Sequence, residues 1–383
     1  MSTILRPAEY VLPGHPDKLC DAVADALVVE AGRLEHRALA GIEVAAHRHH
    51  LYITGRIACE GAETMDIPGI ARNVYESAGH GPDWFPGPGD VEVITDLCLG
   101  PLVPGESEAR DLTDDQGIAT GYAVAIPETN WLPPEHWLAH RLARRLYRLR
   151  TDEPGIGLGP DGKVILVLAE AENGHRQVES LSFSIQQAPY TDEVALVRAV
   201  RHAMADELGQ AARQLPGLVA DLPARLDVNG VGAFLMGGPE GDNGLSGKKL
   251  VVDAYGPRVA IGGGALSGKD FFKADRAGAL LARRIARAVV LSGAAREARA
   301  TLGWFPGDAE LRLFSLEAEG GRQLDTRAWS SLVDLSLAAA GEAWTGAADL
   351  VEVARWGHFT EAEAPWESLR ISPSRPRITA QAA

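Results

Sequence analysis

Three short stretches of this 383-residue sequence place lysines and aspartates beside glycines. They are GHPDK (14–18), GPDGK (159–163) and a longer region over 241–276 that contains GDNGLSGKK and GGGALSGKDFFKADR. Glycines let a backbone approach a ligand closely, lysines neutralise anionic oxygens, and carboxylates bind a metal ion that bridges such oxygens. Each stretch alone is more simply a turn. Their occurrence together in one acidic chain favours a site for a metal-bound polyphosphate.

The segment GGGALSGKD (262–270) resembles a nucleotide-binding P-loop at first sight. Read from Gly263 it matches the pattern G-x-x-x-x-G-K, but the Ser or Thr that should follow and hold Mg²⁺ is Asp270. The residues before Gly262 form no convincing buried strand, and a second lysine follows at Lys273. An ordinary turn and a phosphate site of another kind remain as the two interpretations.

Helices and strands must position these stretches. GHPDK opens a predicted helix over 14–32, in which Pro16 suits the first turn and Asp17 and Asp21 project from one side. Apolar residues recur every four positions along this helix: Leu19, Val23, Leu27 and Ala31. Further helices are predicted over 135–150, 191–208 and 276–293, and strands over 49–57, 90–100, 163–170 and 310–319. The mixture predicts an α+β or α/β fold.

Three other segments lack a regular pattern. Residues 99–114 are rich in Pro, Gly and charge and are typical of a mobile active-site lid. Residues 214–229 hold two prolines and are predicted to be a connector, and 372–383 have the composition of a loose tail.

Composition excludes several classes of protein. The net charge of −15 argues against nucleic-acid and membrane-surface partners, because these require excess Lys and Arg. The start of the chain lacks the pattern of a signal peptide. Cys20, Cys59 and Cys98 are widely spaced, which favours buried free thiols and a cytoplasmic protein. The HRHH run at 47–50 is poorly spaced for a metal and is interpreted as solvated surface.

Five motifs together resemble those of the S-adenosylmethionine synthetase (methionine adenosyltransferase) family. They occur in that family's order and at about its spacing, within residues 9 to 367: GHPDKLCDAVADAL, DDQGIATGYA (114–123), GGPEGDNGLSGKKLVVDAYG (237–256), GGGALSGKDFFKADR and GHFTEAEAPWE (357–367). By this resemblance the glycine-rich stretch at 262–270 is a phosphate-binding loop unrelated to the P-loop.

The resemblance implies an α+β fold of three βαββαβ-type domains related by a pseudo-threefold axis. We expect an N-terminal domain (1–98), the lid (99–114), a central domain (115–232) and a C-terminal domain (233–371) before the tail. It implies a homodimer, or a dimer of dimers, with active sites between subunits. The reaction implied is attack of the methionine sulfur on C5′ of ATP, followed by cleavage of the expelled triphosphate to pyrophosphate and phosphate. Such chemistry needs preorganised cations around the triphosphate.

The resemblance also implies roles for individual residues. His15 faces the departing O5′ oxygen, Asp17 and Asp275 bind two Mg²⁺ ions, and Glu43 binds K⁺. Lysines bind the triphosphate at Lys163, Lys249 and Lys269, with Lys248 where the family usually has Arg. Asp115 and Asp161 lie near the nucleoside and the sulfur, and Phe234 lies beside adenine. Asp242 and Lys273 contact methionine. Removing one lysine from a cluster of like charges is expected to leave stability unchanged or slightly higher.

The departures from the family pattern concern mainly the amino-acid side of the site. Thr54-Gly55-Arg56-Ile57 aligns with Gly-Gly-Glu-Ile, whose Glu contacts the substrate ammonium, so a negative partner has become positive. Either Arg56 points away and another acid takes its role, or the substrate presents a carboxylate or neutral group there. Three hypotheses follow: synthesis of S-adenosylmethionine, the same transfer to a different nucleophile, or a catalytically silent nucleotide-binding subunit of an active synthetase.

Overall fold

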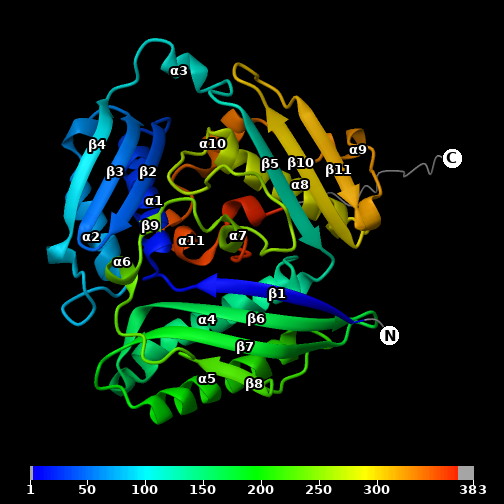
Figure 1. Ribbon diagram of the computed structural model, residues 1–383. Coiled ribbons are helices and arrows are strands. Elements are labelled where there is room, and N and C mark those ends of the chain that lie inside the picture. The colour runs from blue at the N-terminus through cyan, green and yellow to red at the C-terminus, as the bar shows by residue number, and fades with distance from the viewer. Residues whose placement is uncertain (1–2, 370–383) are drawn as a thin grey trace.

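The computed structural model describes residues 3–369 and contains three β-sheets that surround a central group of helices (Figure 1). The sheets have the strand orders β1-β6-β7-β8, β4-β3-β2-β9 and β11-β10-β5. The mixture of helices and sheets confirms the predicted α+β class. The predicted tail over 372–383 lies outside the described residues.

Each sheet collects strands from distant parts of the chain. The first consists of β1 (Thr3–Val11), β6 (Leu158–Ala171), β7 (Arg176–Gln187) and β8 (Arg225–Val228). The second consists of β2 (Leu39–His47), β3 (His50–Ala58), β4 (Glu92–Gly100) and β9 (Gly244–Leu245). The third consists of β5 (Gly117–Val124), β10 (Glu297–Trp304) and β11 (Leu313–Ala318). The sheets therefore interleave along the sequence: β1 pairs with β6, β9 with β2, and β5 with β10.

Helices fill the centre and cover the sheets. The longer helices are α1 (Pro16–Leu34), α2 (Ile67–Ser77), α4 (Pro134–Asp152), α5 (Glu193–Gln214), α8 (Ala279–Leu291) and α10 (Leu337–Trp344). The shorter ones are α3 (Glu106–Ala109), α6 (Gly238–Gly241), α7 (Leu250–Asp253), α9 (Arg327–Ser330) and α11 (Leu350–Trp356). A π-helical turn, η5 (Ala274–Gly278), precedes α8, and single 3₁₀ turns are η1 (Ala62–Thr64), η2 (Pro88–Asp90), η3 (Pro127–Thr129), η4 (Pro154–Ile156), η6 (Glu319–Gly321) and η7 (Pro365–Glu367).

Helix α1 lies at the centre and is buried on two opposite sides. His15 caps its start by accepting the Asp17 amide on Nδ1, and Pro16 occupies the first turn. The predicted apolar stripe is fully buried: Leu19, Val23, Leu27 and Ala31. The acidic side is buried as well, because glycine-rich loops of the C-terminal region pack against it.

Three sequence predictions differ from the structure. The connector predicted over 214–229 contains β8, which pairs in parallel with β7. The segment 99–114 is not wholly irregular, since it contains α3 and a buried arginine, Arg110. Cys98 is exposed, in contrast to Cys20 and Cys59, because it lies on β4 at the edge of its sheet.

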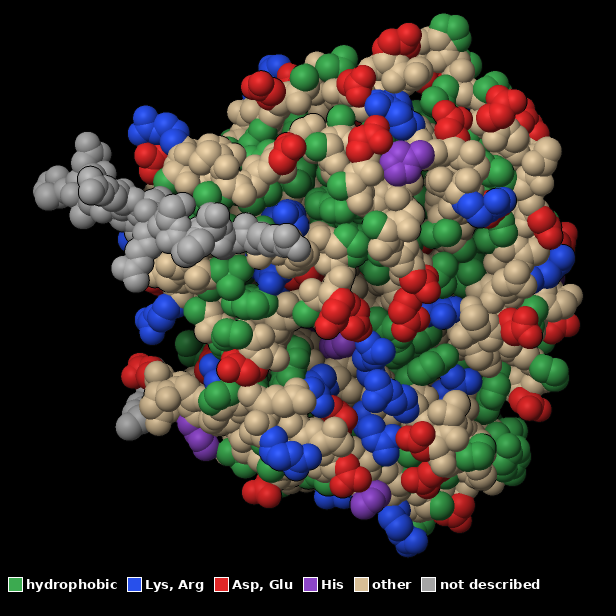
Figure 2. Space-filling view, turned by 180° about the vertical axis from the view of Figure 1, so that it is seen from behind, with side chains coloured by type: hydrophobic (Ala, Val, Ile, Leu, Met, Phe, Trp, Pro, Cys, Tyr) green, Lys and Arg blue, Asp and Glu red, His purple; other side chains and the backbone are tan. Residues whose placement is uncertain are grey.

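Acidic and basic side chains are interspersed over most of the face seen from behind (Figure 2). Lys and Arg side chains gather in its lower half, the half that holds α4 and α5 (Figures 1 and 2). Three arginines of α4 pair with carboxylates: Arg141 with Glu207, Arg144 with Glu361 and Arg145 with Asp152. Among residues 3–369, no helix combines the length and the apolar character that a membrane crossing requires.

Candidate active site

A row of three aspartates on α1 holds the glycine-rich loops in place. Asp17, Asp21 and Asp25 are spaced four residues apart and therefore lie along one side of the helix. Their carboxylates accept backbone N–H groups from Leu245 at 3.0 Å, Gly247 at 2.7 Å and Gly268 at 2.9 Å respectively. Both lysine-bearing loops are thus attached to one helix.

Buried cations balance this row of acids. Lys18, fully buried, lies between Asp21 at 3.2 Å and the carboxylate of Asp253. Arg276, also fully buried, pairs with Asp25. Burial raises the pKa of Asp25, although Arg276 and the Gly268 amide oppose that shift. Sequence reasoning noted Asp21 but missed Asp25, and the four-residue spacing was the signal that could have identified it.

The first group of predicted site residues lines a cavity of about 190 Å³. His15 comes from the start of α1, Asp161 and Lys163 from β6, and Phe234 and Asp242 from the loop that surrounds α6. The loop before α1 approaches β6 so closely that a Cβ on Gly14 would lie 2.4 Å from the Pro160 Cβ. This close approach explains why glycine precedes His15.

Burial changes the ionisation of two residues in this cavity. Burial lowers the pKa of His15 to about 4, and the positive charges of Lys249 and Lys163 act in the same direction. Burial raises the pKa of Asp161 to about 6, against the stabilising N–H of Gly238, which donates to its Oδ2 at 2.8 Å. At neutral pH His15 is therefore uncharged, and its Nδ1 accepts the Asp17 amide, which leaves the proton on Nε2.

Asp17 connects this cavity to two lysines. Its buried carboxylate accepts from Lys249 Nζ at 2.7 Å and lies 3.6 Å from Lys248 Nζ. Burial opposes ionisation of Asp17, but hydrogen bonds from Lys249 and the Leu245 amide outweigh it and lower the pKa. Lys248 is the more exposed of the two lysines, with 42% of its side chain accessible against 16% for Lys249.

A second group of predicted residues surrounds the second glycine-rich loop. Lys269 pairs with Asp275, and Lys273 pairs with Asp114 at 2.5 Å. A Cβ on Gly264 would lie 2.2 Å from Cγ of Asp275, so the loop passes directly over that carboxylate. The predicted nucleoside acid, Asp115, is exposed and accepts the Gln116 amide, and it is the neighbouring Asp114 that the structure brings to this group.

Asp270, which breaks the P-loop pattern, has a structural position. It is buried and accepts the amides of Ala40 and Phe272, each at 2.8 Å. The guanidinium of Arg110 also donates to it and lies 4.5 Å from the centroid of the Phe272 ring. Asp270 therefore fixes the glycine-rich loop to β2 and to the lid segment. Both of its carboxylate oxygens accept hydrogen bonds in these contacts.

Arg56 is bound to the lid. Its guanidinium donates two hydrogen bonds to the Glu106 carboxylate, at 2.9 Å and 2.8 Å, and Glu106 also accepts the Val103 amide. The positive charge of Arg56, at the position where the family resemblance predicts a carboxylate, therefore faces a carboxylate supplied by α3. Sequence reasoning identified the change at Arg56 but missed Glu106, because 50 residues separate the two.

Glu43 lies on β2, near the first glycine-rich loop. Its exposed carboxylate accepts the hydroxyl of Ser246 at 2.7 Å, and the same hydroxyl accepts the Val44 amide at 2.9 Å. The structure thus places two side-chain oxygen atoms next to each other at the predicted K⁺ position.

Comparison with known proteins gives matches along almost the whole chain. Family models of S-adenosylmethionine synthetase match three consecutive segments: the N-terminal domain at residues 3–85, the central domain at 111–234 and the C-terminal domain at 236–368.

Individual relatives agree with these matches. The S-adenosylmethionine synthase of Petrotoga mobilis is 30% identical over 398 residues, covering 96% of this chain and 97% of its own. That of Brachyspira hyodysenteriae is 33% identical over 306 residues, covering 76% and 75%. That of Clostridium tetani is 29% identical over 385 residues, covering 94% and 96%. With all three domain models matched in order and the Petrotoga mobilis relative aligned over nearly its full length, the chain belongs to the S-adenosylmethionine synthetase family.

Proposed function

We propose that this protein forms S-adenosylmethionine from ATP and methionine. A sulfur lone pair of methionine forms a bond to C5′, the C5′–O5′ bond breaks, and triphosphate leaves with the bonding electrons. Water then cleaves the triphosphate to pyrophosphate and phosphate before release. The names of the relatives and the site geometry support this assignment.

The observation that carries the proposal is the neutral His15 beside cations. Its Nδ1 is occupied by the Asp17 amide, so its Nε2–H is the remaining donor. A neutral, mostly buried donor that lines a cavity can hydrogen-bond an oxygen on which negative charge develops, and it costs no reorganisation during the reaction. Lys163, in the same cavity, and Lys249, paired with Asp17, supply positive charge close to that oxygen.

All five predicted substrate-binding lysines lie beside a carboxylate: Lys163 beside Glu9, Lys248 and Lys249 beside Asp17, Lys269 beside Asp275 and Lys273 beside Asp114. These pairs hold the cations in position within an acidic protein. When triphosphate binds, its oxygens take the place of the carboxylates at the lysines. The carboxylates are then free to bind metal.

Asp17 and Asp275 fit the expected Mg²⁺ sites. Both are carboxylates beside lysines, and the loop over Asp275 leaves no space for a Cβ at Gly264, as expected for a ligand-binding loop that approaches closely. Mg²⁺ bound there would supply charge against the phosphate oxygens. Glu43 and Ser246 offer the oxygen atoms that K⁺ prefers.

A second copy of the chain is proposed to complete each site. Exposed apolar side chains lie beside both groups of site residues, with Met236 68% and Leu245 44% exposed near the first and Ile118 61% exposed near the second. We expect a homodimer in which the first group of one subunit faces the second group of its partner. A cytoplasmic location is proposed with it, in keeping with the free thiols.

Product analysis tests the activity. Purified protein is incubated with ATP, Mg²⁺ and K⁺, with and without methionine, and the products are identified by mass spectrometry. S-adenosylmethionine, pyrophosphate and phosphate are expected only with methionine. Coexpressing His15→Asn with Asp275→Asn tests the shared site, because a mixed dimer keeps one intact site and regains part of the activity that both variants lack.

A different nucleophile is the second candidate, and Arg56 is the observation that favours it. A substrate with a carboxylate in place of the methionine ammonium could exchange with Glu106 at this guanidinium. Adenosyl products formed from a related thioether or another nucleophile, with methionine unused, would select this candidate.

A further inference from the structure

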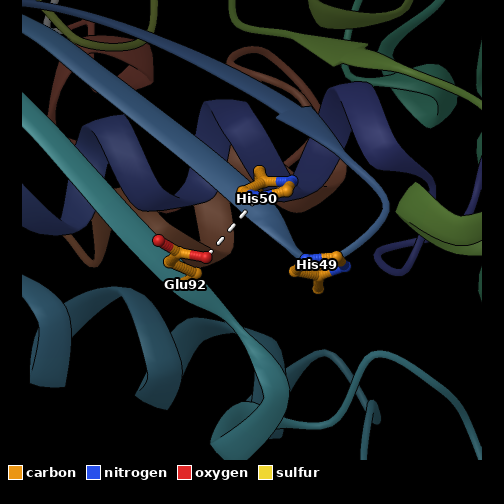
Figure 3. Close-up of side chains that lie close together, drawn as sticks. All are labelled: His49, His50 and Glu92. Atoms are coloured by element: carbon orange, nitrogen blue, oxygen red, sulfur yellow. Dashed lines mark ion pairs between the residues drawn. The ribbon is translucent and has the colours of Figure 1, made fainter.

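The hairpin between β2 and β3 carries histidines that the adenosyl-transfer chemistry does not use. The run His47, Arg48, His49, His50 forms its turn. Glu92 begins β4, and because β3 and β4 pair in parallel with His50 and Glu92 in register, their side chains meet at one end of the sheet (Figure 3). The histidines alone are poorly spaced in the sequence to bind a metal. The fold brings a third possible ligand, Glu92, next to them from the neighbouring strand.

The geometry of these side chains suits a small cation. Ligand atoms of His49, His50 and Glu92 all lie within 4.8 Å of one another. The Nε2 atom of His50 is 3.4 Å from Oε2 of Glu92, which is long for a hydrogen bond. Bonds of about 2.0–2.1 Å to a tetrahedral Zn²⁺ place neighbouring ligand atoms roughly 3.4 Å apart. This pair is therefore already at the separation that a bound metal requires.

The turn keeps His49 next to this pair. The Arg48 amide donates to the Pro239 carbonyl at 2.6 Å, which anchors the turn to the start of α6. Arg48 has a φ of 53°, a left-handed conformation that bends the chain sharply between the two strands. As a result the ring of His49 lies with its centroid 4.0 Å from that of His50.

We propose that His49, His50 and Glu92 bind one divalent transition-metal ion of the Zn²⁺ type, with water completing its coordination. Two imidazoles and one carboxylate favour Zn²⁺ and similar ions over Mg²⁺, which prefers oxygen ligands alone. The negative net charge of the protein attracts cations to its surface. None of these three ligands is among the residues proposed to bind Mg²⁺, Asp17 and Asp275.

Zn²⁺ titration of the intact protein tests this site. Calorimetry is performed in excess Mg²⁺, which fills sites made of oxygen ligands, on wild type, His50→Ala and Glu92→Gln. The matched control is His36→Ala, since His36 forms a single exposed pair with Glu342 at 3.3 Å and has no second histidine in that pair. Melting temperatures verify that each variant is folded.

Wild type and His36→Ala are expected to bind one Zn²⁺ per chain more than His50→Ala does. Glu92→Gln should weaken that binding by more than the roughly 10- to 100-fold typical of losing an outer-shell partner, because it removes a direct ligand. Equal Zn²⁺ binding by wild type, His50→Ala and Glu92→Gln would overturn the proposal. An equal loss in His36→Ala would also overturn it, because binding would then not depend on this cluster.

Discussion

Reversing the charge at Arg56 is expected to open the lid segment. In Arg56→Glu the newly introduced carboxylate faces that of Glu106 where a bidentate pair now exists. The segment retains the buried anchor between Arg110 and Asp270, so we expect local opening around α3 and not global unfolding. The double variant Arg56→Glu/Glu106→Arg restores opposite charges at the same two positions.

The size of the effect follows from the geometry of the pair. Unit charges about 4 Å apart interact by roughly 4 kcal/mol at an effective dielectric constant near 20. The side chains are 31% and 24% exposed, so solvent and salt screen much of that energy and a net value of about 1 kcal/mol remains. Such a value changes the population of the open lid about fivefold. Repulsion in the single variant adds to this loss, and the double variant regains it.

Two assays report on the lid. Limited proteolysis within 101–112 measures opening directly and does not depend on the proposed reaction. The kcat/KM for methionine measures whether opening matters for catalysis. Arg33→Glu is the matched control, because Arg33 forms a similar bidentate pair with Glu30, at 2.9 Å and 2.6 Å, on the distant end of α1.

One result would refute this reasoning. If Arg56→Glu were cleaved no faster than Arg33→Glu, and the double variant did not differ from the single one, the pair would not hold the lid. An Arg56→Glu variant with a lower KM for methionine and unchanged proteolysis would instead assign position 56 to direct contact with the substrate ammonium.

The further predictions concern His15, Asp161 and the two lysines beside Asp17. His15→Asn should slow adenosyl transfer by at least about 100-fold, because one buried donor to a developing oxyanion is worth about 3 kcal/mol; hydrolysis of added tripolyphosphate should fall less, and an equal loss of both would contradict the role. The kcat/KM should fall as pH decreases through about 6, because Asp161 becomes protonated there while His15, with a pKa of about 4, stays neutral. The Asp161→Asn variant should lose this pH dependence. If the variant kept the same pH dependence, another group would be responsible. Because folding raises the pKa of Asp161, this residue makes the protein less stable as pH rises from about 4 to 6, so Asp161→Asn should not lower the melting temperature at pH 8. Lys249→Ala should destabilise the protein by about 1–3 kcal/mol, because it removes a hydrogen-bond partner of the buried Asp17 carboxylate. Lys248→Ala should change stability little, because Lys248 is more exposed. Equal melting temperatures for the two variants would contradict this prediction.

The carboxylate partners of the lysines reverse the stability expected from the sequence. The sequence predicts that the lysines form a cluster of like charges, so removing one of them should not lower the stability of the protein. In the structure each of Lys163, Lys249, Lys269 and Lys273 faces a carboxylate. Except for Lys269 and Asp275, which are six residues apart, the paired residues come from distant parts of the chain, and such contacts have no signature in the local sequence.

The sequence by itself determined the family, the α+β class and the start of α1. Motifs are local, and Pro16 with the four-residue apolar repeat is enough to predict that helix. The same spacing contained Asp17, Asp21 and Asp25, although only contact with the loops shows why three acids are needed there.

Only the tertiary structure decided which distant side chains meet. The lid carboxylate of Glu106 binds Arg56, Asp270 binds Arg110, and Glu92 joins His50 across neighbouring strands. Strand register and loop packing determine these contacts. Both depend on the burial of apolar surface over the whole chain, which local sequence patterns do not specify. For that reason an unfavourable spacing, such as HRHH, or a reversed charge, such as Arg56, could be interpreted only after the chain was folded.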